Sequence, residues 1–188
     1  MRTTSSQVSS MPSGGARHTE SGSTDFRDVF DGEFAYVWTS LRRLGVAPRD
    51  LEDVTHDVLF EVFRNLDRYD SARPLRPWLF AFAFRFASDY RRSARNRLEV
   101  YGASIEPTTA PQGEEAVAAR ESRALVAAAL EHVDLARRAV FILHDIEEWS
   151  MREIAECLGV PLQTAYSRLH TARTEFIAAA RNLQRGGP

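Results

Sequence analysis

The chain has 188 residues, which allows one domain or two small ones. Apolar residues make up 44% of the chain and charged residues 27%, so most of its length can bury a core. The 24 basic and 26 acidic residues give a net charge of −2, which argues against indiscriminate binding of nucleic acids.

The N-terminal part predicts a tail followed by two helices. Residues 1–24 are rich in Ser, Thr and Gly and lack the apolar stretch of a secretion signal, so we expect a disordered tail. Apolar residues then recur every three or four positions and predict a helix over 26–44, which Gly45 ends. A second amphipathic helix over 51–66 has an apolar stripe that includes Phe63 and, on another face, an acidic edge made of Asp53, Asp57 and Glu61.

Charge is segregated along the chain. Residues 25–70 hold eleven acidic side chains against six arginines, whereas residues 85–97 hold five arginines against one acid, Asp89. This pattern indicates separate polyanion contacts and acidic docking faces. Solvated helix faces are the alternative explanation.

The next stretch combines a loop with an ambiguous apolar segment. Residues 68–77 contain two prolines and the turn-forming Tyr69-Asp70-Ser71, which predicts a loop. In the segment 78–97, phenylalanines alternate with Ala and Arg as in a half-buried strand. We favour a helix because the segment runs for about 20 residues without a turn signal and follows Pro77. Its longest apolar run, Trp78–Phe84, has seven residues, far fewer than the roughly 20 that cross a bilayer, so we expect no membrane insertion.

A change of composition marks a domain boundary. Residues 101–113 are rich in Gly, Pro and Thr, so we expect 99–114 to be a linker between a domain over 25–98 and a second over 115–183, with a tail over 184–188. Two further helices are predicted over 114–132 and 135–143. The sequence therefore predicts an all-α fold of two small helical domains joined by a flexible linker.

The strongest local signal lies between Ser150 and Pro161. Ser150 and Glu153 have the spacing of a capping box, which starts a helix at Met151. Gly159 supplies the left-handed residue that ends this helix, and the proline starts the next one, so the pair forms a helix-turn-helix. The outward face of the second helix carries groups that suit base edges and phosphates, namely Gln163, Thr164, Tyr166, Ser167, Arg168, His170 and Arg173. A plain structural hairpin is the alternative.

Cys157 is the single cysteine. It therefore excludes a disulfide within the chain and a multi-thiolate metal site, which fits a reducing compartment. Because it lies inside the capped helix, we interpret it as a small core residue and not as a redox sensor.

Stretches from both halves together resemble one known family. They are Leu51–Leu59, Trp78–Ala83 running into Tyr90–Arg92, Arg138–Phe141, Ser150–Pro161 and Ser167–Arg173. In this order they resemble regions 2 and 4 of an extracytoplasmic-function (ECF) RNA polymerase sigma factor of the sigma-70 family. The resemblance implies a bacterial, cytoplasmic transcription initiation factor that directs core RNA polymerase to promoters. It implies no enzymatic activity, no cofactor and no metal.

The resemblance also assigns roles in the first half. Asp53, Asp57 and Glu61 would dock on the clamp helices of the largest polymerase subunit, and region 4 would contact the flap of the second-largest subunit. The loop after residue 68 and the helix behind it would recognise and melt the −10 element. Aromatic groups would take an extracted base and arginines would hold phosphates. The residues with these roles are Tyr69, Arg73, Arg76, Trp78, Arg85, Arg91, Arg92 and Arg95.

In the second half, the resemblance implies that the outward face defined above reads the −35 element. Gln163, Thr164, Tyr166, Ser167 and His170 would face bases, and Arg168 and Arg173 would contact phosphates. Tyr166 and Thr171 stand where relatives often have basic residues, so we expect weak binding of the free protein to DNA. The resemblance further implies an anti-sigma factor as a partner.

Two other functions compete with this interpretation. The pairs His56-Asp57 and His144-Asp145 resemble the metal-binding pair of HD-type phosphohydrolases, although such a site needs further ligands. Alternatively, the helix-turn-helix could belong to a free-standing regulator that binds a palindrome as a dimer without polymerase.

Overall fold

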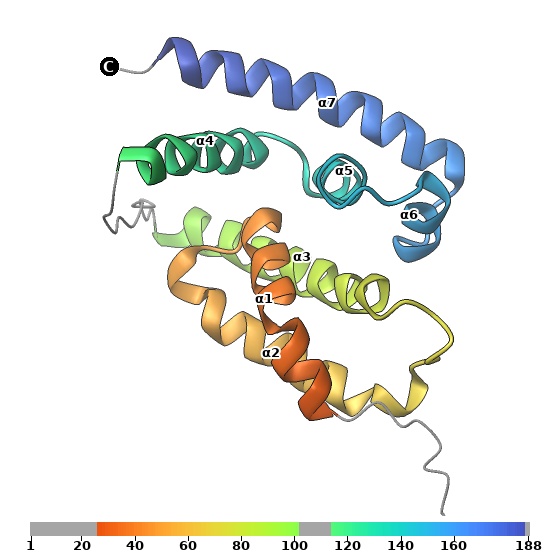
Figure 1. The fold of residues 1–188 in the computed structure, drawn as a ribbon. Coiled ribbons are helices and arrows are strands. Elements are labelled where there is room, and N and C mark those ends of the chain that lie inside the picture. Colours follow the sequence, from red (N-terminus) through yellow and green to blue (C-terminus); the bar gives the residue numbers. More distant parts are fainter. Residues whose placement is uncertain (1–25, 102–113, 187–188) are drawn as a thin grey trace, which may run out of the picture.

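The structure, a computed structural model, describes the backbone of residues 26–101 and 114–186 and, within these ranges, the side chains of 32–93 and 121–186. Every regular element in this part of the chain is helical, which confirms the all-α class (Figure 1). The elements are α1 (Phe26–Leu44), η1 (Pro48–Asp50), α2 (Leu51–Arg64), η2 (Leu66–Arg68), α3 (Leu75–Tyr101), α4 (Glu114–Glu131), α5 (Leu135–Phe141), η3 (Ile142–Ile146), α6 (Met151–Cys157) and α7 (Leu162–Arg185).

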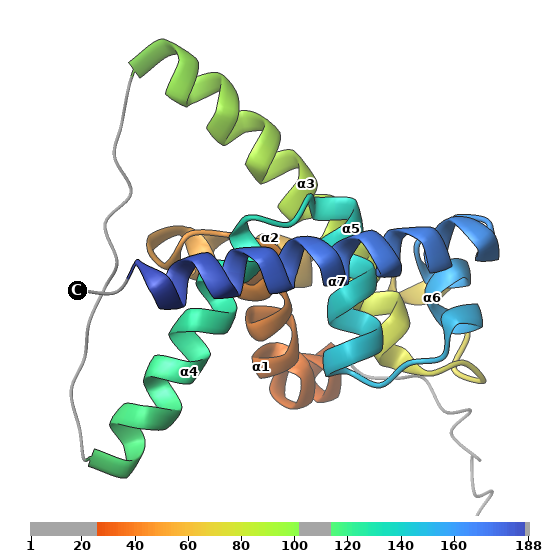
Figure 2. The same ribbon diagram turned by 90° about the horizontal axis from the view of Figure 1, so that it is seen from above.

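The helices form two stacked groups. Helix α1 packs against α2 and α3, and helix α7 packs against α4, α5 and α6. The second group lies over the first, with α5 and α6 between α7 and the α1–α3 group (Figure 1). The C-terminal part of α3 and the N-terminal part of α4 extend away from the body on the same side (Figure 2). The predicted linker 99–114 begins within the last turn of α3 and ends at the first residue of α4. Residues 102–113 of this linker lie outside the described residues. The predicted tail 1–24 and the last two residues of the predicted tail 184–188 also lie outside them.

One large apolar cluster joins the two groups. It contains Val37, Leu41 and Leu59 from the first group and Val140, Leu143 and Ile154 from the second, each at most 1% exposed. A smaller cluster inside the second group holds Leu130, Val133, Phe141 and Ala172. The two groups therefore bury apolar side chains against each other as well as within themselves, and burial of this kind is the main source of stability.

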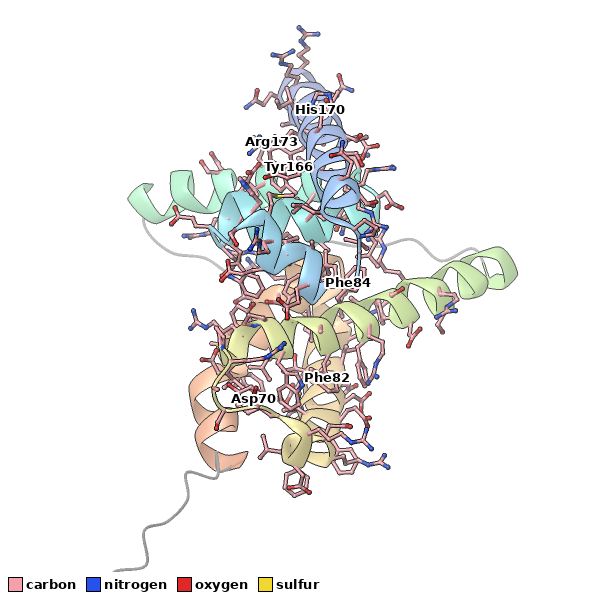
Figure 3. All side chains as sticks on the ribbon, turned by 90° about the vertical axis from the view of Figure 1, so that its right-hand side faces the viewer. Asp70, Phe82, Phe84, Tyr166, His170 and Arg173 are labelled. Atoms are coloured by element: carbon pink, nitrogen blue, oxygen red, sulfur yellow. The ribbon has the colours of Figure 1, made fainter. Side chains whose placement is uncertain are left out.

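Helix α3 explains the alternating phenylalanines. Phe80 is fully buried and its ring lies 6.2 Å from that of Trp149 in the second group. Phe84, one turn further along, points toward the side of α6, whereas Phe82 points to the opposite side of α3 (Figure 3). A helix that packs on two opposite faces repeats its apolar residues at i, i+2 and i+4, which imitates the period of a strand.

Most predicted helix boundaries agree with the structure. Helix α1 has the predicted bounds, and Gly45 ends it at a φ of 95°, a left-handed conformation that favours glycine. Helix α3 starts three residues before Trp78, with Pro77 in its first turn, where a missing N–H is tolerated. The predicted helix over 135–143 is α5 followed by the π-helical turn η3.

One prediction about α2 is wrong. The sequence pattern places Phe63 on the apolar stripe, but this side chain is 53% exposed and lies beside Phe60, which is 62% exposed. The stripe that is buried consists of Leu51, Thr55, Val58, Leu59 and Val62. Phe63 follows Val62 directly and is therefore turned about 100° away from it, toward solvent.

Candidate nucleic-acid and polymerase interfaces

The first turns of α7 present a row of polar side chains. Gln163, Tyr166, Ser167 and His170 are exposed and lie at the spacing i, i+3, i+4 and i+7, which places them on one face of the helix. Ala165, Leu169 and Ala172 lie on the opposite face and are buried. The predicted reading surface is thus assembled and exposed to solvent. Thr164 and Arg168 are partly exposed beside it. Figure 3 labels Tyr166, His170 and Arg173 along α7.

The capping box fixes the start of α6, the helix that precedes α7. The Ser150 backbone N–H donates to Glu153 Oε2 at 2.9 Å, and the Glu153 N–H donates to Ser150 Oγ at 3.3 Å. The hydrogen bonds from Ser150 lower the pKa of the Glu153 carboxyl, so this box is charged at neutral pH. Gly159 adopts a φ of 61°, as a left-handed residue does at the end of a helix. The helix-turn-helix predicted from the sequence is therefore present in its local details.

Arg173 has a different environment from the other residues of α7. Its guanidinium makes two hydrogen bonds to Asp145, Nε to Oδ2 at 2.8 Å and Nη2 to Oδ1 at 2.6 Å. The same carboxylate contacts His144 Nδ1 at 2.7 Å. The Arg173 hydrogen bond is the main reason that the pKa of Asp145 is lowered. Arg173 thus ties α7 to η3, and its charge is largely balanced before any phosphate approaches.

On the other half, three aromatic rings form a ladder beside the loop. The Tyr69 and Trp78 ring centroids are 5.0 Å apart, and Trp78 and Phe82 are also 5.0 Å apart in an edge-to-face arrangement. The guanidinium of Arg85 lies 5.2 Å from the centre of the Phe82 ring. Rings of this kind stack with unpaired bases, and a nearby arginine supports the backbone phosphate. The structure therefore brings together Tyr69, Trp78 and Arg85 from the predicted −10 set.

The remaining arginines of that set lie elsewhere. Arg76 pairs with Glu33 at 3.1 Å and lies over the Tyr36 ring, and Arg92 pairs with Asp89. Arg73 contacts Glu156 of α6 at 2.8 Å, and a terminal nitrogen of Arg91 lies against Gly45, close to the second half. The side chain of Arg95 lies outside the described residues. Arg73, Arg76 and Arg92 of the predicted set are thus already paired with acidic side chains.

Helix α2 has an exposed face that combines charge with large apolar groups. Asp53 and Asp57 are exposed on it, and Phe60 lies one turn beyond Asp57. Glu61 is engaged elsewhere, because Arg85 Nη2 of α3 lies 3.8 Å from its carboxylate and Asn65 donates to it at 3.0 Å. An exposed patch of acidic and aromatic side chains is typical of a protein-binding surface.

Comparisons with known proteins identify the family of this chain. The sigma-70 region 2 family matches residues 35–97, and the sigma-70 region 4 family matches residues 123–176. The ECF RNA polymerase sigma factor SigL of Mycobacterium tuberculosis is 35% identical over 148 residues, which cover 78% of this chain and 83% of SigL. The chain belongs to the sigma-70 family. Within it, the chain is an ECF-type sigma factor, a promoter-recognising initiation factor of transcription.

Other relatives of this sigma factor agree. The RNA polymerase sigma factor NccH of Alcaligenes xylosoxydans is 32% identical over 148 residues, which cover 76% of this chain and 80% of NccH. Among solved structures, CnrH in complex with the cytosolic domain of CnrY has a TM-score of 0.61 at 25% identity and covers 86% of this chain and 89% of CnrH. RpoE of Bartonella quintana, in complex with the anti-sigma factor NepR, shows the same fold, with a TM-score of 0.62 at 22% identity and coverage of 82% of this chain and 98% of RpoE.

Three features of this sigma factor are not predicted from its sequence. Phe60 is exposed three positions after Asp57 and therefore lies on the same helical face. Phe82 is only partly buried, and its ring completes the aromatic ladder. The partnership of Arg173 with Asp145 has no local signal, because the two residues are separated by 28 positions.

The two His-Asp pairs lie in different halves of the sigma factor. His56 is on α2, where its Nδ1 contacts the Glu52 carbonyl at 2.9 Å, and His144 is in η3. Among the described residues, no three His, Cys, Asp or Glu side chains are grouped to hold a metal ion. In the same part of the chain, no helix is long and apolar enough to span a membrane.

Proposed function

We propose that this sigma factor docks on bacterial core RNA polymerase through α2 and reads promoter DNA through two surfaces, the aromatic ladder at α3 and the outward face of α7. In this proposal the polymerase performs the chemistry and the sigma factor contributes no catalytic residue, cofactor or metal. The observation that carries the proposal is the α7 face. Four polar side chains are exposed in a row on a capped helix-turn-helix, with the buried stripe behind them.

The α2 face is suited to the clamp helices of the largest polymerase subunit. Asp53 and Asp57 supply acidic groups for a basic partner surface, and the exposed Phe60 and Phe63 supply apolar area to bury. Glu61 takes a different part, since its carboxylate is already near Arg85. We propose that it orients Arg85 beside the aromatic ladder. Region 4 would contact the flap of the second-largest subunit.

The aromatic ladder is suited to a base that has left the DNA duplex. Extraction of a base costs a few kcal/mol of stacking and pairing, which new stacking contacts must offset. Tyr69 and Trp78 flank the turn at residues 70–74 and are themselves held by ring contacts. Arg85 stands beside them as the cation for a neighbouring phosphate.

The α7 face is suited to the major groove of the −35 element. Gln163, Ser167 and His170 offer donors and acceptors for base edges, and Tyr166 offers a ring and a hydroxyl. Arg168 is the arginine available for phosphate contact, while Arg173 is engaged with Asp145. We propose in addition that the protein works in the cytoplasm and that an anti-sigma factor restrains it, as NepR binds the related RpoE.

Transcription in vitro tests this function. Core RNA polymerase with the purified protein should initiate from promoters selected from a random library, and core enzyme alone should not. The Gln163→Ala and His170→Ala variants should select an altered −35 sequence and keep the −10 sequence. If the two variants select the same −35 sequence as the unmodified protein, the α7 face does not read it. If the purified protein binds a palindrome as a dimer and never stimulates polymerase, the free-standing regulator is the correct alternative.

A further inference from the structure

The two halves of the sigma factor meet along a surface that we call the seam. It is formed by α1 and α3 on one side and by α4, α5, α6 and residues 147–149 on the other. At its centre the Phe80 ring contacts Trp149, and at its edge the side chains of Arg43 and Glu147 form an ion pair. Both charged groups are partly shielded from solvent, since Arg43 is 30% and Glu147 19% exposed.

Two contacts across the seam hold the end of the −10 loop and the first turn of α3. Arg73 Nη1 donates to Glu156 Oε1 at 2.8 Å, and the Cys157 thiol donates to the Pro77 carbonyl at 3.3 Å. Glu156 and Cys157 are adjacent at the end of α6, the first helix of the helix-turn-helix. One short segment of region 4 thus contacts both ends of the segment 73–77, next to the aromatic ladder. The Arg73 pair is exposed, so it competes directly with a DNA phosphate for the same guanidinium.

The closed seam also contains groups that destabilise it. Arg138 of α5 is fully buried, and its Nη1 has no hydrogen-bond partner; its Nε and Nη2 both donate to the Val133 carbonyl. A Cβ placed on Gly45 would lie 2.5 Å from Nη1 of both Arg138 and Arg91, so two guanidinium groups meet at one glycine. Burial, and then the charge of Arg91, lower the pKa of Arg138 to about 10. The negative end of the α1 dipole offsets only part of the repulsion between the guanidinium groups of Arg138 and Arg91.

Another buried polar group lies nearer the start of α1. The hydroxyl of Tyr36 has no hydrogen bond of standard geometry, and burial, followed by the charge of the Glu147 carboxylate, raises its pKa. Buried polar atoms without partners favour any state in which water reaches them. The seam therefore combines apolar area that closes it with charged and polar groups that gain hydration when it opens, as is typical of interfaces that separate in use.

The proposed polymerase-binding and DNA-binding surfaces are not all equally accessible while the seam is closed. The exposed α2 face with Asp53 and Asp57 and the exposed α7 face with Tyr166 and His170 are both outside it. The segment 73–77, by contrast, belongs to the proposed −10 surface and makes two polar contacts to the other half. The closed form is thus able to dock on polymerase but holds the −10 loop against region 4.

We propose that the closed seam is a self-restrained state of the free sigma factor, in which Glu156 and Cys157 of α6 latch the segment 73–77 and must release it before the −10 loop binds DNA. The proposal rests on the proposed function, because it gives the loop a DNA partner. Closure of the seam in the free protein, however, can be measured without polymerase or promoter DNA.

Cys157 provides a reporter of the seam because it is the single cysteine of the chain. Burial raises the pKa of its thiol to about 12, so the closed form holds little reactive thiolate at pH 8. The full-length protein is treated with N-ethylmaleimide, and the modified fraction is followed by mass spectrometry of the intact chain. The Glu147→Arg variant replaces the ion pair with Arg43 by a repulsion, and we expect Cys157 to react at least tenfold faster.

Two further variants separate the latch from general damage. The double variant with Arg43→Glu and Glu147→Arg restores opposite charges and should react within about threefold of the unmodified protein. The matched control Asp89→Arg breaks the exposed pair with Arg92 on α3, away from the seam, and should leave the rate unchanged. Circular dichroism checks that each variant is folded, and Trp149→Ala replaces Glu147→Arg if that variant is not. Rapid reaction of Cys157 in the unmodified folded protein, or equal rates in all variants, would overturn the closed seam.

Binding to a fluorescent single-stranded oligonucleotide of mixed sequence tests the restraint itself. Glu156→Gln removes the negative charge that holds Arg73 and so weakens this contact without adding a positive charge, and we expect two- to fivefold tighter binding. Glu52→Gln, on the exposed side of α2, makes the same charge change without touching the loop and should bind as the unmodified protein does. Equal tightening by both variants would show an effect of net charge and reject the latch. If the protein does not support transcription by polymerase but Cys157 reacts slowly, the proposed function is rejected and the closed seam still stands.

Discussion

The two proposed DNA surfaces of this sigma factor differ in how complete they are in the free protein. On α7, the outward side chains Gln163, Tyr166 and His170 are exposed and stand on the second helix of a capped helix-turn-helix. At α3, the aromatic rings of Tyr69, Trp78 and Phe82 already contact one another, and Arg73 already has an acidic partner. The α7 surface is preformed for DNA binding, whereas the α3 surface must exchange contacts within the protein for contacts with DNA.

This difference follows from the kind of DNA that each surface meets. A base edge in the major groove of a duplex is available without any change in the DNA, so a rigid, preformed row of side chains is sufficient. A base inside the −10 duplex is not available until it is extracted, so the protein needs apolar ring area that is covered until then. Exposed rings would favour aggregation, and rings that stack on each other avoid it.

The largest expected effect is on the α3 surface. We expect Trp78→Ala to lower transcription from a duplex promoter by about 10- to 100-fold, because one base–ring stack contributes about 1–3 kcal/mol. A promoter that is mismatched over the −10 region no longer needs extraction of the base, so on this template the loss should be small. Initiation assays on both templates measure the ratio, and Trp78→Phe, which keeps a ring, should lie between the two proteins. Equal losses on both templates would contradict a role in melting.

The next effect concerns docking, which should not depend on either DNA surface. We expect Asp53→Arg to weaken binding to core RNA polymerase by about tenfold or more, since a charge reversal opposes an electrostatically complementary surface. Fluorescence anisotropy with labelled protein measures the dissociation constant. Glu121→Arg makes the same charge change on an exposed position of α4 and is the control. Unaltered binding of Asp53→Arg would place the docking surface elsewhere.

A smaller effect, and a gain, is expected on α7. Tyr166 is 52% exposed on the outward face of α7. We expect Tyr166→Arg to add one phosphate contact, which raises the affinity for −35 duplex DNA about three- to tenfold at low salt and steepens the log–log salt dependence by about one unit. Filter binding at several salt concentrations measures both quantities. A gain in affinity without a change of slope would mean that the introduced guanidinium does not reach a phosphate.

The sequence predicted those parts of the structure that depend on neighbouring residues. The capping box of Ser150 and Glu153, the left-handed Gly45 and Gly159, and the exposed row on α7 all follow from spacing within one or two turns. The helical state of α3 was also predicted, although its alternating phenylalanines imitate a strand. Local rules were sufficient because each of these features is satisfied within its own segment.

Features that depend on the contact between the halves could not be predicted in this way. Nothing near Arg138 indicates that it is fully buried against Gly45, and nothing near Arg73 indicates that Glu156 is its partner. The exposed Phe63 is a related case, because the predicted apolar stripe of α2 is one residue too wide. For the candidate sites, the sequence therefore predicted which types of residue are present. It did not predict which of these side chains are already paired with other side chains of the protein.

The smallest expected effect concerns the ion pair that fixes α7. The pKa of Asp145 is lowered in the folded protein, chiefly by its hydrogen bond from Arg173, so the pair stabilises the fold above the ordinary carboxyl pKa of about 3.9. That stabilisation is lost as the pH falls through the lowered pKa. Because Arg173 is 49% exposed, we expect Asp145→Asn to cost only about 0.5–1 kcal/mol at pH 7, a shift of roughly 1–4 °C in Tm.

Thermal unfolding of both proteins between pH 7 and pH 3 measures this contribution. The difference in Tm should be constant at neutral pH and should shrink below about pH 4, where Asp145 is protonated first in the unfolded chain and then, at its lowered pKa, in the folded protein. Arg173→Ala should remove the same stabilisation and yet leave promoter binding nearly unchanged if the guanidinium is committed to Asp145. A loss of salt dependence in DNA binding by Arg173→Ala would instead show that Arg173 leaves the carboxylate for a phosphate, and the α7 surface would then need rearrangement as the α3 surface does.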